Sequence, residues 1–325
     1  MQFERKKRIA VLTSGGDAPG MNAAIRAAVR NSIWHGAEVL GVLRGYDGLL
    51  AGDFIPLDHK SVGGVILYGG TLLQTARCDR FLTPEGVKEG YDNLKAFGVD
   101  ALVVIGGDGS FHGAEKLAAL GMQVVGVPAT IDKDMGGTFT TIGFDTACNT
   151  ARECVRKLRD TASSHDRMFI VEVMGRNAGF LALETAVACG AEYVLVPEIE
   201  TNFDELCERL RSSKSCGKNH AIVILAEGVM SASQLADKLR SMDCGYDPKI
   251  TVLGHLQRGG SPTSYDVVLA TRLADMAIEA IYRGETNVMT GLMNNNIITC
   301  PISDAWEKKG PLDMELFNMI EKLSK

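Results

Sequence analysis

The sequence lacks several features that would assign it to a class directly. Its 325 residues contain no GxxxxGK[ST] pattern, which excludes a Walker-type nucleotide loop. The eight cysteines include no CxxC pair, so we expect reduced thiols and neither a zinc site nor a disulfide framework. The formal net charge of −6 gives no reason to expect nucleic acid as a partner. No apolar run reaches the length of a membrane span and no signal-peptide core is present, so we expect a cytoplasmic protein without membrane contact.

A strand followed by a glycine-rich turn stands out at residues 102–110. Its first four residues form an unbroken apolar run, which is typical of a strand buried on both faces. Gly-Gly-Asp-Gly-Ser follows at 106–110, and a helical pattern begins at 111–120. Glycines at the end of a strand let backbone amides approach a phosphate, and a helix N-terminus favours negative charge. Asp108 suits a phosphate site if a cation such as Mg²⁺ lies between the two anions, so the stretch predicts a metal–nucleotide site.

The same turn has two other interpretations. Gly-Gly-Asp-Gly is also a common turn sequence, and a turn between a strand and a helix often needs glycine for its backbone shape alone. The spacing Gly107-x-Gly109-x-x-x-Gly113 lies one residue off the dinucleotide fingerprint, so a nicotinamide cofactor is a weak match. Other turns in the chain must decide between these interpretations.

Two further turns strengthen the prediction of a ligand site. The turn at 14–22 is rich in glycine, follows an apolar strand and precedes a helix. The turn at 129–134 carries Asp132 and Asp134. Because the carboxyl ends of neighbouring parallel strands share one edge of a sheet, these carboxylates can converge on the site that holds Asp108. One of them could then serve as a base or an orienting group.

Strand and helix patterns alternate along the whole chain. This alternation predicts right-handed crossovers and parallel sheets, and therefore an α/β fold of two doubly wound domains with ligands in a cleft between them. The predicted strands include 8–13, 38–43, 123–128, 168–174, 193–196 and 220–226, and the predicted helices include 21–33, 145–160, 203–211, 233–242 and 265–282.

Seven motifs in a fixed order carry a resemblance to a known family. They are Thr-Ser-Gly-Gly-Asp-Ala-Pro-Gly-Met-Asn (13–22), Gly-Gly-Thr…Ala-Arg (69–77), Gly-Gly-Asp-Gly-Ser (106–110), Thr-Ile-Asp-x-Asp (130–134), Ser-Ser-His-x-Arg (163–167), Val-Glu-Val-Met-Gly-Arg (171–176) and Gly-His-Leu-Gln-Arg-Gly-Gly-Ser-Pro (254–262). A lone GGDG is shared with NAD kinases and lipid kinases, but the whole set is not. Over nearly its full length the chain resembles the bacterial-type ATP-dependent 6-phosphofructokinases.

The resemblance implies a reaction, a domain plan and an assembly. The reaction is phosphoryl transfer from Mg-ATP to the 1-hydroxyl of fructose 6-phosphate, which gives fructose 1,6-bisphosphate and ADP in glycolysis. The fold implied is two Rossmann-like domains with largely parallel sheets and the active site in a cleft between them. A nucleotide-binding domain is expected at 1–143 plus 257–306, and a sugar-phosphate-binding domain at 144–256 plus 307–325. A homotetramer with a nucleoside diphosphate or phosphoenolpyruvate effector is also implied.

The resemblance further assigns roles to individual residues. It implies that Asp132 is the general base for the 1-hydroxyl and that Asp108 holds Mg²⁺. The other catalytic residues implied are Thr130, Asp134, Arg77 and Arg176. Nucleotide binding is implied for Gly15, Gly16, Tyr46, Arg77, Cys78, Gly107, Asp108, Gly109, Ser110 and Gly113. Substrate binding is implied for Thr130, Asp132, Arg167, Met174, Gly175, Arg176, Glu227, Lys249, His255 and Arg258, and effector binding for Arg26, Arg30, His59, Arg159, Glu192 and Lys218.

Several positions depart from the family pattern near the expected active site. Position 133 is usually asparagine and is lysine here. This lysine leaves two alternatives open: it pairs with Asp132 or Asp134 and lowers the basicity of the base, or it points outward. Lys249 stands where arginine is usual, so the charge is kept but the guanidinium fork is lost. Ala129 replaces the glycine that is usual in ATP users.

The expected effector pocket is altered as well. His59 and Cys216 occupy positions that are usually basic in the family. Two weakened or missing cations should reduce affinity for an effector with two negative charges. The sequence therefore predicts weakened or altered control by ADP and phosphoenolpyruvate.

Two alternatives to an ATP-dependent kinase remain open at this point. Lys133, Lys249 and the replaced nucleotide contacts at Cys78 and Leu82 are compatible with a weakly catalytic or non-catalytic paralogue that acts as a regulatory subunit. A kinase that uses pyrophosphate or another sugar phosphate is the second alternative. Gly109 favours ATP, because pyrophosphate users in the family typically carry aspartate at this position.

Overall fold

The structure is a computed structural model that describes residues 5–163 and 167–323. The chain forms two compact units, which we call the larger and the smaller unit. Of the described residues, those within 1–130, 135–145 and 258–310 form the larger unit, and those within 131–134, 146–257 and 311–325 form the smaller unit. In the part of the chain that is described, no helix combines the length and apolar character needed to cross a membrane.

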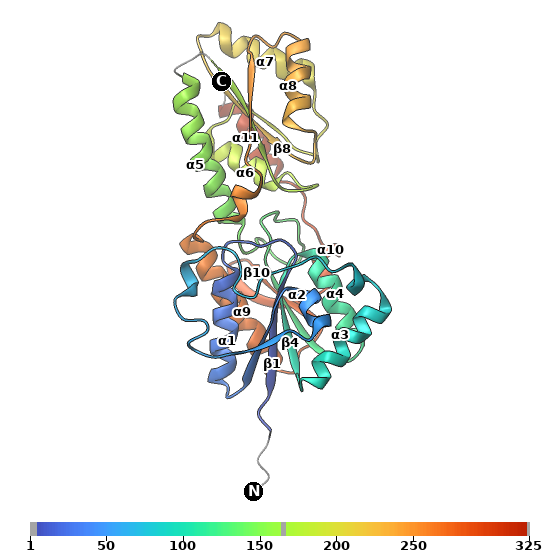
Figure 1. Ribbon diagram of the computed structural model, residues 1–325. Helices are drawn as coiled ribbons and strands as arrows, with labels where there is room; N and C mark the ends of the chain where they lie inside the picture. The colour runs from blue at the N-terminus through green and yellow to red at the C-terminus, as the bar shows by residue number, and fades with distance from the viewer. Residues whose placement is uncertain (1–4, 164–166, 324–325) are drawn as a thin grey trace. The chain divides into compact units, whose positions relative to one another are not determined.

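A seven-stranded sheet forms the centre of the larger unit, in the order β11-β10-β5-β4-β1-β2-β3 (Figure 1). The pairs β2/β3 and β10/β11 are antiparallel and all other pairs are parallel. The chain builds the sheet outward from β1 in one direction and then from β4 in the other, so the topological switch point lies between these two strands. The strands are β1 (Arg8–Ser14), β2 (Glu38–Val42), β3 (Phe54–Leu57), β4 (Ala101–Gly106), β5 (Gln123–Pro128), β10 (Val288–Met293) and β11 (Asn296–Pro301).

Helices cover both faces of this sheet (Figure 1). One face carries α1 (Met21–Trp34) and α9 (Ser264–Tyr282), and the other carries α2 (Gly45–Ala51), α3 (Pro84–Ala96), α4 (Asp108–Ala119) and the short α10 (Asp304–Glu307). The 3₁₀ helices are η1 (Val65–Leu67) and η2 (Asp79–Leu82). Leu102 and Val104 of β4 pack with Phe111 and Leu117 of α4 in one core cluster. Because both faces are covered, β4 is buried along its whole length, as its apolar run predicts.

The smaller unit contains a parallel four-stranded sheet in the order β7-β8-β6-β9. Its strands are β6 (Met168–Val173), β7 (Tyr193–Leu195), β8 (Ala221–Ala226) and β9 (Pro248–Val252), and η3 (Gly254–Arg258) follows β9. One core cluster joins the sheet to α5 (Phe144–Ser163), α6 (Phe180–Cys189) and α11 (Met314–Leu323). A second cluster joins its other face to α7 (Phe203–Ser215) and α8 (Ala232–Ser241). The two doubly wound units confirm the predicted fold class.

Helix α4 begins earlier than the sequence pattern predicts. Its first residue is Asp108, whereas the apolar periodicity predicts a helix over 111–120 that begins at residue 111. Gly109 and Ser110 therefore belong to the first helical turn, and the glycine turn itself is shorter than expected. A carboxylate in the first turn is stabilised by the positive end of the helix dipole, which explains why the helix can include Asp108.

The antiparallel hairpin of β10 and β11 and the helix α3 are absent from the sequence prediction. The two residues between the hairpin strands, Asn294 and Asn295, have φ angles of 49° and 63°. Two-residue hairpin turns need this left-handed conformation, and asparagine tolerates it better than most residues. The Asn-Asn pair between two apolar runs was the signal that could have revealed the hairpin.

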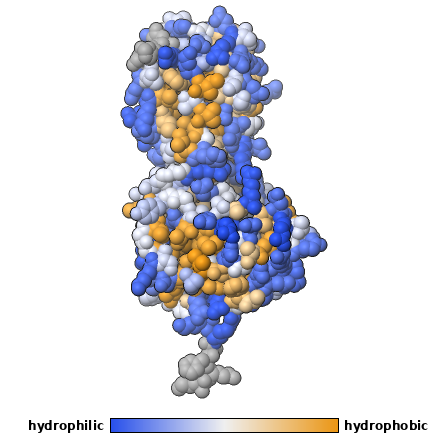
Figure 2. Space-filling model, viewed as in Figure 1, coloured by the Kyte–Doolittle hydropathy of each residue, from blue (hydrophilic) through white to orange (hydrophobic). Residues whose placement is uncertain are grey.

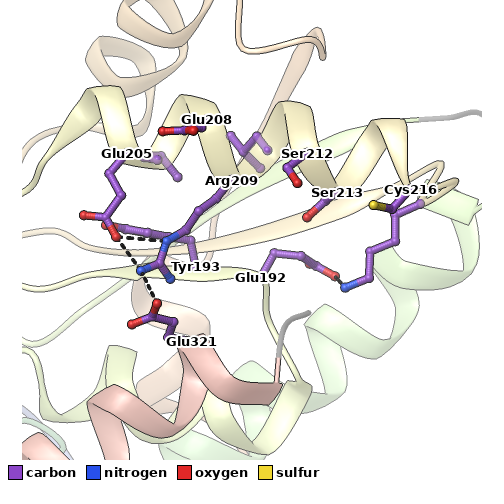
Figure 3. A pocket seen from close by; sticks show the side chains of 12 residues that line it. Glu192, Tyr193, Glu205, Glu208, Arg209, Ser212, Ser213, Cys216 and Glu321 are labelled. Atoms are coloured by element: carbon purple, nitrogen blue, oxygen red, sulfur yellow. Dashed lines mark hydrogen bonds and ion pairs between the residues drawn. The ribbon is translucent and has the colours of Figure 1, made fainter.

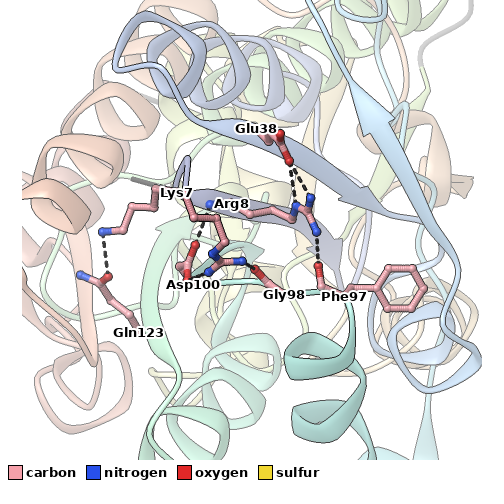
Figure 4. A network of polar contacts seen from close by, with 8 residues as sticks. Lys7, Arg8, Glu38, Phe97, Gly98, Asp100 and Gln123 are labelled. Atoms are coloured by element: carbon pink, nitrogen blue, oxygen red, sulfur yellow. Dashed lines mark hydrogen bonds and ion pairs between the residues drawn. The ribbon is translucent and has the colours of Figure 1, made fainter. Parts of the chain in front are cut away.

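A polar network aligns the amino ends of four strands of the larger unit (Figure 4). The backbone N–H of Arg8 donates to Oδ2 of Asp100 at 2.8 Å, and Nη2 of Arg8 donates to Oε2 of Glu38 at 2.6 Å. Lys7 donates to Oε1 of Gln123 at 3.3 Å. The Arg8 guanidinium lowers the pKa of the Glu38 carboxyl, which favours its charged form. These polar side chains join the amino ends of neighbouring strands. The glycine turns lie at the carboxyl ends of the strands, so the network does not belong to the expected ligand site.

Candidate active site

The loops that follow β1, β4 and β5 lie side by side in the larger unit. Ser14 of β1 is paired in register with Gly106 of β4, which is paired with Pro128 of β5. Thr130 comes two residues later, and a Cβ atom built on Gly107 would lie 3.6 Å from the Cβ atom of Thr130. The switch point lies between β1 and β4, so most of the nucleotide residues predicted by resemblance gather where an open sheet of this kind binds ligands.

Hydrogen bonds fix the loop 69–77 against the first glycine turn. Asn22 at the start of α1 accepts from the backbone N–H of Leu72 at 2.6 Å. Thr75 donates to the carbonyl oxygen of Gly15 at 2.7 Å, and Gly15 has a φ of 87° that favours glycine. Arg77 is exposed at the end of this loop. Its backbone position is therefore set by contacts between two of the sequence motifs.

The turn at 106–110 is closed at its start and open at its tip. A Cβ atom on Gly106 would lie 2.5 Å from the carbonyl oxygen of Ser14, so no larger residue fits there. A Cβ atom on Gly109 would meet no described atom within 4 Å. Ser110 is 3% exposed, and its Oγ atom has no hydrogen-bond partner among the described residues. An orphaned hydroxyl at a helix N-terminus beside a glycine turn fits a phosphate ligand.

Two side chains lie close to the carboxylate of Asp108. Nζ of Lys309 lies 3.0 Å from Oδ2, and Nε2 of His112 lies 3.3 Å from Oδ1. The imidazole of His112 stacks on Trp306 with ring centroids 3.9 Å apart. Sequence reasoning missed Lys309 because it lies about 200 positions from Asp108 in the chain, with no motif around it.

Tyr46 and Gly113 support the turn from within the core. The Tyr46 hydroxyl donates to the carbonyl oxygen of Ser110 at 2.5 Å, and its ring stacks on Phe81. Tyr46 is 6% exposed, and burial raises the pKa of its hydroxyl. A Cβ atom on Gly113 would lie 2.7 Å from the Tyr46 ring, so glycine is needed for this packing. Both residues are predicted to bind the nucleotide, and in this structure they are buried and support the turn at Ser110.

In the smaller unit, the residues after β6 and β8 are joined at the carboxyl end of the sheet. Oε1 of Glu227 accepts from the backbone N–H groups of Gly175 and Arg176, at 3.2 and 2.8 Å. Arg176 has a φ of 52°, which is uncommon for a residue other than glycine. The backbone N–H of Met174 donates to Oε1 of Gln257 at 3.0 Å. This network holds the Arg176 side chain exposed at the sheet edge.

Asp132 belongs to the smaller unit and lies beside Arg176. Asp132 is 5% exposed, and Nε of Arg176 lies 3.8 Å from its Oδ2 atom. A largely buried carboxylate next to an exposed guanidinium can accept a proton while a cation orients an anionic substrate. Asp132 and Arg176 are two of the catalytic residues implied by the resemblance, and the structure brings them together.

The cations expected to bind the sugar phosphate are distributed over both units. Arg167 precedes β6, and the three residues before it, at 164–166, lie outside the described part of the chain. Lys249 donates to Oδ2 of Asp247 at 2.6 Å, which lowers the pKa of that carboxyl. His255 is exposed in η3 of the smaller unit. Arg258 belongs to the larger unit, where a Cβ atom on Gly16 would lie 2.7 Å from its guanidinium.

Comparisons with known proteins place the chain in a family. A family model described as phosphofructokinase matches residues 8–281. The chain belongs to the phosphofructokinase family. A curated ATP-dependent 6-phosphofructokinase of Halalkalibacterium halodurans is 50% identical over 318 residues, which cover 98% of this chain and 99% of that protein. One of Clostridium botulinum strain Hall is 50% identical over 319 residues, covering 98% of this chain and 100% of that protein.

Solved structures of phosphofructokinases share the fold. The phosphofructokinase of Saccharomyces cerevisiae matches with a TM-score of 0.88 and 37% identity over 98% of this chain. The match covers 48% of the yeast chain, so this chain spans about half its length. A pyrophosphate-dependent phosphofructokinase from Marinobacter aquaeolei has a TM-score of 0.84 at 22% identity, covering 95% of this chain and 86% of that one, and shows the fold alone.

Two effector residues expected of a phosphofructokinase line a cavity of about 550 Å³ in the smaller unit (Figure 3). They are Glu192 and Lys218, and Nζ of Lys218 lies 3.7 Å from Oε1 of Glu192. Cys216 lines the same cavity. At the opposite end, Nη2 of Arg209 lies 3.1 Å from Oε1 of Glu321.

The other expected effector residues lie elsewhere. Arg26, Arg30 and His59 belong to the larger unit. In the smaller unit, Arg159 donates to the carbonyl oxygens of Cys189 and Gly190 at 2.8 and 2.9 Å. These are carbonyls at the end of α6, so Arg159 also caps a helix C-terminus.

Lys133, where phosphofructokinases usually carry asparagine, pairs with a residue that sequence reasoning missed. Its Nζ atom lies 2.6 Å from Oε1 of Glu184 on α6. The Lys133 side chain is 17% exposed, so the alternative that it points outward is wrong. Lys133 has a φ of 55°, so the backbone of the loop is in the left-handed region at this position. The ion pair ties that loop to α6 one residue from Asp132.

We expect Glu184→Gln to lower turnover by about two- to tenfold, because the Lys133 charge loses its partner beside Asp132. The double variant Lys133→Asn/Glu184→Gln should recover most of the loss, since no charge is then left unbalanced. Lys133→Asn alone should not raise turnover. Steady-state kinetics of the four proteins measures this coupling.

Asp237→Asn is the matched control for this cycle. It breaks an exposed ion pair with Arg240 on α8 of the same unit, in which the two atoms lie 3.0 Å apart. The turnover of the Asp237→Asn variant should equal that of the wild-type protein. If the effects of Lys133→Asn and Glu184→Gln on turnover were strictly additive, the two side chains would not be coupled. The ion pair would then have no influence on Asp132.

Proposed function

We propose that this chain is an ATP-dependent 6-phosphofructokinase, which transfers the γ-phosphoryl group of Mg-ATP to the 1-hydroxyl of fructose 6-phosphate. The products are fructose 1,6-bisphosphate and ADP, as in glycolysis. The observation that carries the proposal is the 50% identity, over nearly the whole chain, to curated proteins with this activity. The larger unit binds the nucleotide and the smaller unit the sugar phosphate.

Asp132 is the proposed general base. It accepts the proton of the 1-hydroxyl as that oxygen attacks the γ-phosphorus, a role typically worth about 10²- to 10⁴-fold in rate. Arg176, whose Nε atom lies 3.8 Å from Asp132, and Arg77 offset the charge on the transferring group. Thr130 and Asp134 position the two reactants.

The residues at the α4 N-terminus fit a magnesium nucleotide. Gly15, Gly16 and Gly107 present backbone to the phosphates, and Ser110 offers its unused hydroxyl. Among the described residues, no cluster of three or more His, Cys, Asp or Glu side chains could hold a metal ion. Mg²⁺ is commonly bound by one or two carboxylates together with phosphates and water, and Asp108 would supply that carboxylate. When bound, Mg²⁺ supplies positive charge to the phosphates.

Cationic side chains are proposed to bind the 6-phosphate of the sugar. They are Arg167, Arg176, Lys249, His255 and Arg258, with Met174, Gly175 and Glu227 lining the sugar. Arginine suits a phosphate dianion because its fork makes two parallel hydrogen bonds. Lys249 offers only a point charge, and in this structure it is paired with Asp247.

A homotetramer is proposed as the working assembly. Large apolar side chains are exposed in both units, including Leu67, Tyr68 and Val268 in the larger unit and Val252 and Leu256 in the smaller one. Apolar side chains are visible on one face of each unit in Figure 2. Exposed apolar surface commonly marks contacts between proteins.

Effector control is proposed to be weak. Among the described residues, the cavity that contains Glu192 and Lys218 is lined by four glutamates and by two cationic side chains, Arg209 and Lys218. This excess of negative charge, with Cys216 in place of a cation, disfavours ADP or phosphoenolpyruvate. Added ADP should therefore cause little increase in the rate at which fructose 1,6-bisphosphate forms from fructose 6-phosphate and Mg-ATP.

The decisive assay follows fructose 1,6-bisphosphate formation from fructose 6-phosphate with Mg-ATP, with pyrophosphate as the control donor. Turnover with ATP alone is expected. Turnover with pyrophosphate instead would support a different donor. Background rates with both, together with a rise in melting temperature on ligand addition, would support the regulatory paralogue.

A further inference from the structure

The segment that follows α10 brings a lysine to the expected nucleotide site. Lys308 and Lys309 are adjacent, but their side chains reach different carboxylates. Nζ of Lys308 lies 2.9 Å from Oδ2 of Asp304, within its own helical turn. Nζ of Lys309 lies 3.0 Å from Oδ2 of Asp108, at the first residue of α4.

Several contacts fix this segment. The backbone N–H of Lys308 donates to the carbonyl oxygen of Asp304 at 3.1 Å. Trp306 stacks on His112, whose Nε2 atom lies 3.3 Å from the other oxygen of Asp108. A Cβ atom on Gly136 would lie 2.5 Å from the carbonyl carbon of Lys308, so the backbones pack closely here. Lys309 is therefore presented to Asp108 by a packed segment.

The pair has an electrostatic consequence for nucleotide binding. Asp108 stands beside the glycine turn and the unused hydroxyl of Ser110, where phosphates are expected. Without a cation, its negative charge would repel them. Asp108 is 26% exposed and Lys309 42% exposed, so solvent weakens their attraction without cancelling it.

We propose that Lys309 is a built-in counter-ion for Asp108, which balances the carboxylate while no divalent cation is bound. This inference rests on the proposed nucleotide site. Asp108 would hold Mg²⁺ in the Mg-ATP complex, and the positive charge of the metal would then balance the carboxylate, so Lys309 would matter most for nucleotide without metal. The lysine thereby sets how strongly nucleotide affinity depends on Mg²⁺.

The test is calorimetric binding of ATP to the whole protein, once in EDTA and once with saturating Mg²⁺. Lys309→Met should weaken binding in EDTA by about two- to fivefold, the range expected for an exposed ion pair. Binding of Mg-ATP should change by less than twofold.

Lys308→Met is the matched control, since it removes the same charge one residue away. It should change neither affinity. An equal loss in Lys308→Met and Lys309→Met, or an equal loss for Lys309→Met with and without Mg²⁺, would overturn the counter-ion role. Failure of the wild-type protein to bind ATP under both conditions would instead contradict the proposed function.

Discussion

Asp132→Ser is expected to lower the turnover number by about 100- to 10,000-fold, because serine cannot accept the proton of the sugar hydroxyl. The KM for fructose 6-phosphate should change far less. Loss of the carboxylate leaves the Arg176 guanidinium available to an anionic substrate, so ground-state binding is retained. Steady-state kinetics with Mg-ATP measures both quantities.

Two comparisons separate this chemical effect from a loss of folding. Asp237→Ser removes an exposed carboxylate from α8 of the same unit and should leave turnover unchanged. The melting temperature of Asp132→Ser, and its shift on addition of fructose 6-phosphate, should stay close to those of the wild-type protein. Turnover within threefold of wild type would remove Asp132 from the role of general base.

Gly109→Asp is expected to reduce kcat/KM for ATP by about 100-fold or more while the fold is kept. A Cβ atom at this position meets no described atom within 4 Å, so the side chain is accommodated. An aspartate in the first turn of α4 is favourable for the helix itself. Its charge, however, follows Asp108 directly in the turn that is expected to bind the phosphates, and like charges in contact cost several kcal/mol.

Gly109→Ala and Gly109→Asn are the matched controls, because they fill the same space without the charge. Both should keep ATP turnover within a few-fold of wild type. Rates with ATP and with pyrophosphate should be measured in parallel for all four proteins. An equal loss in the alanine variant would show that space, and not charge, decides the donor at this position.

The sequence predicts most of what local chemistry determines. The run before Gly106 predicts a buried strand, and the turn that follows it lies at the carboxyl end of that strand, as expected. Membership of the family also follows from the order of the motifs. The helix start is wrong by three residues, because the stabilising position of Asp108 in the first helical turn does not appear in an apolar pattern.

The remaining features depend on contacts between distant segments. Neither Glu184 nor Lys309 lies in a motif, and each acts only because the fold brings it to Lys133 or Asp108. Tyr46, which the resemblance assigns to nucleotide binding, is buried and donates to the carbonyl oxygen of Ser110, a contact that the sequence alone does not reveal. Partners of charged side chains could be found only with the structure.

Asn22 gives the larger unit one further property. Its side chain donates to the carbonyl oxygen of Gly69 at 3.2 Å and accepts from the backbone N–H of Leu72 at 2.6 Å, and Asn22 is the second residue of α1. The first glycine turn and the loop that ends at Arg77 are thus joined through one side chain. A displacement of α1 would therefore shift the first glycine turn and the loop that ends at Arg77 together, and with them the residues that are proposed to bind the donor.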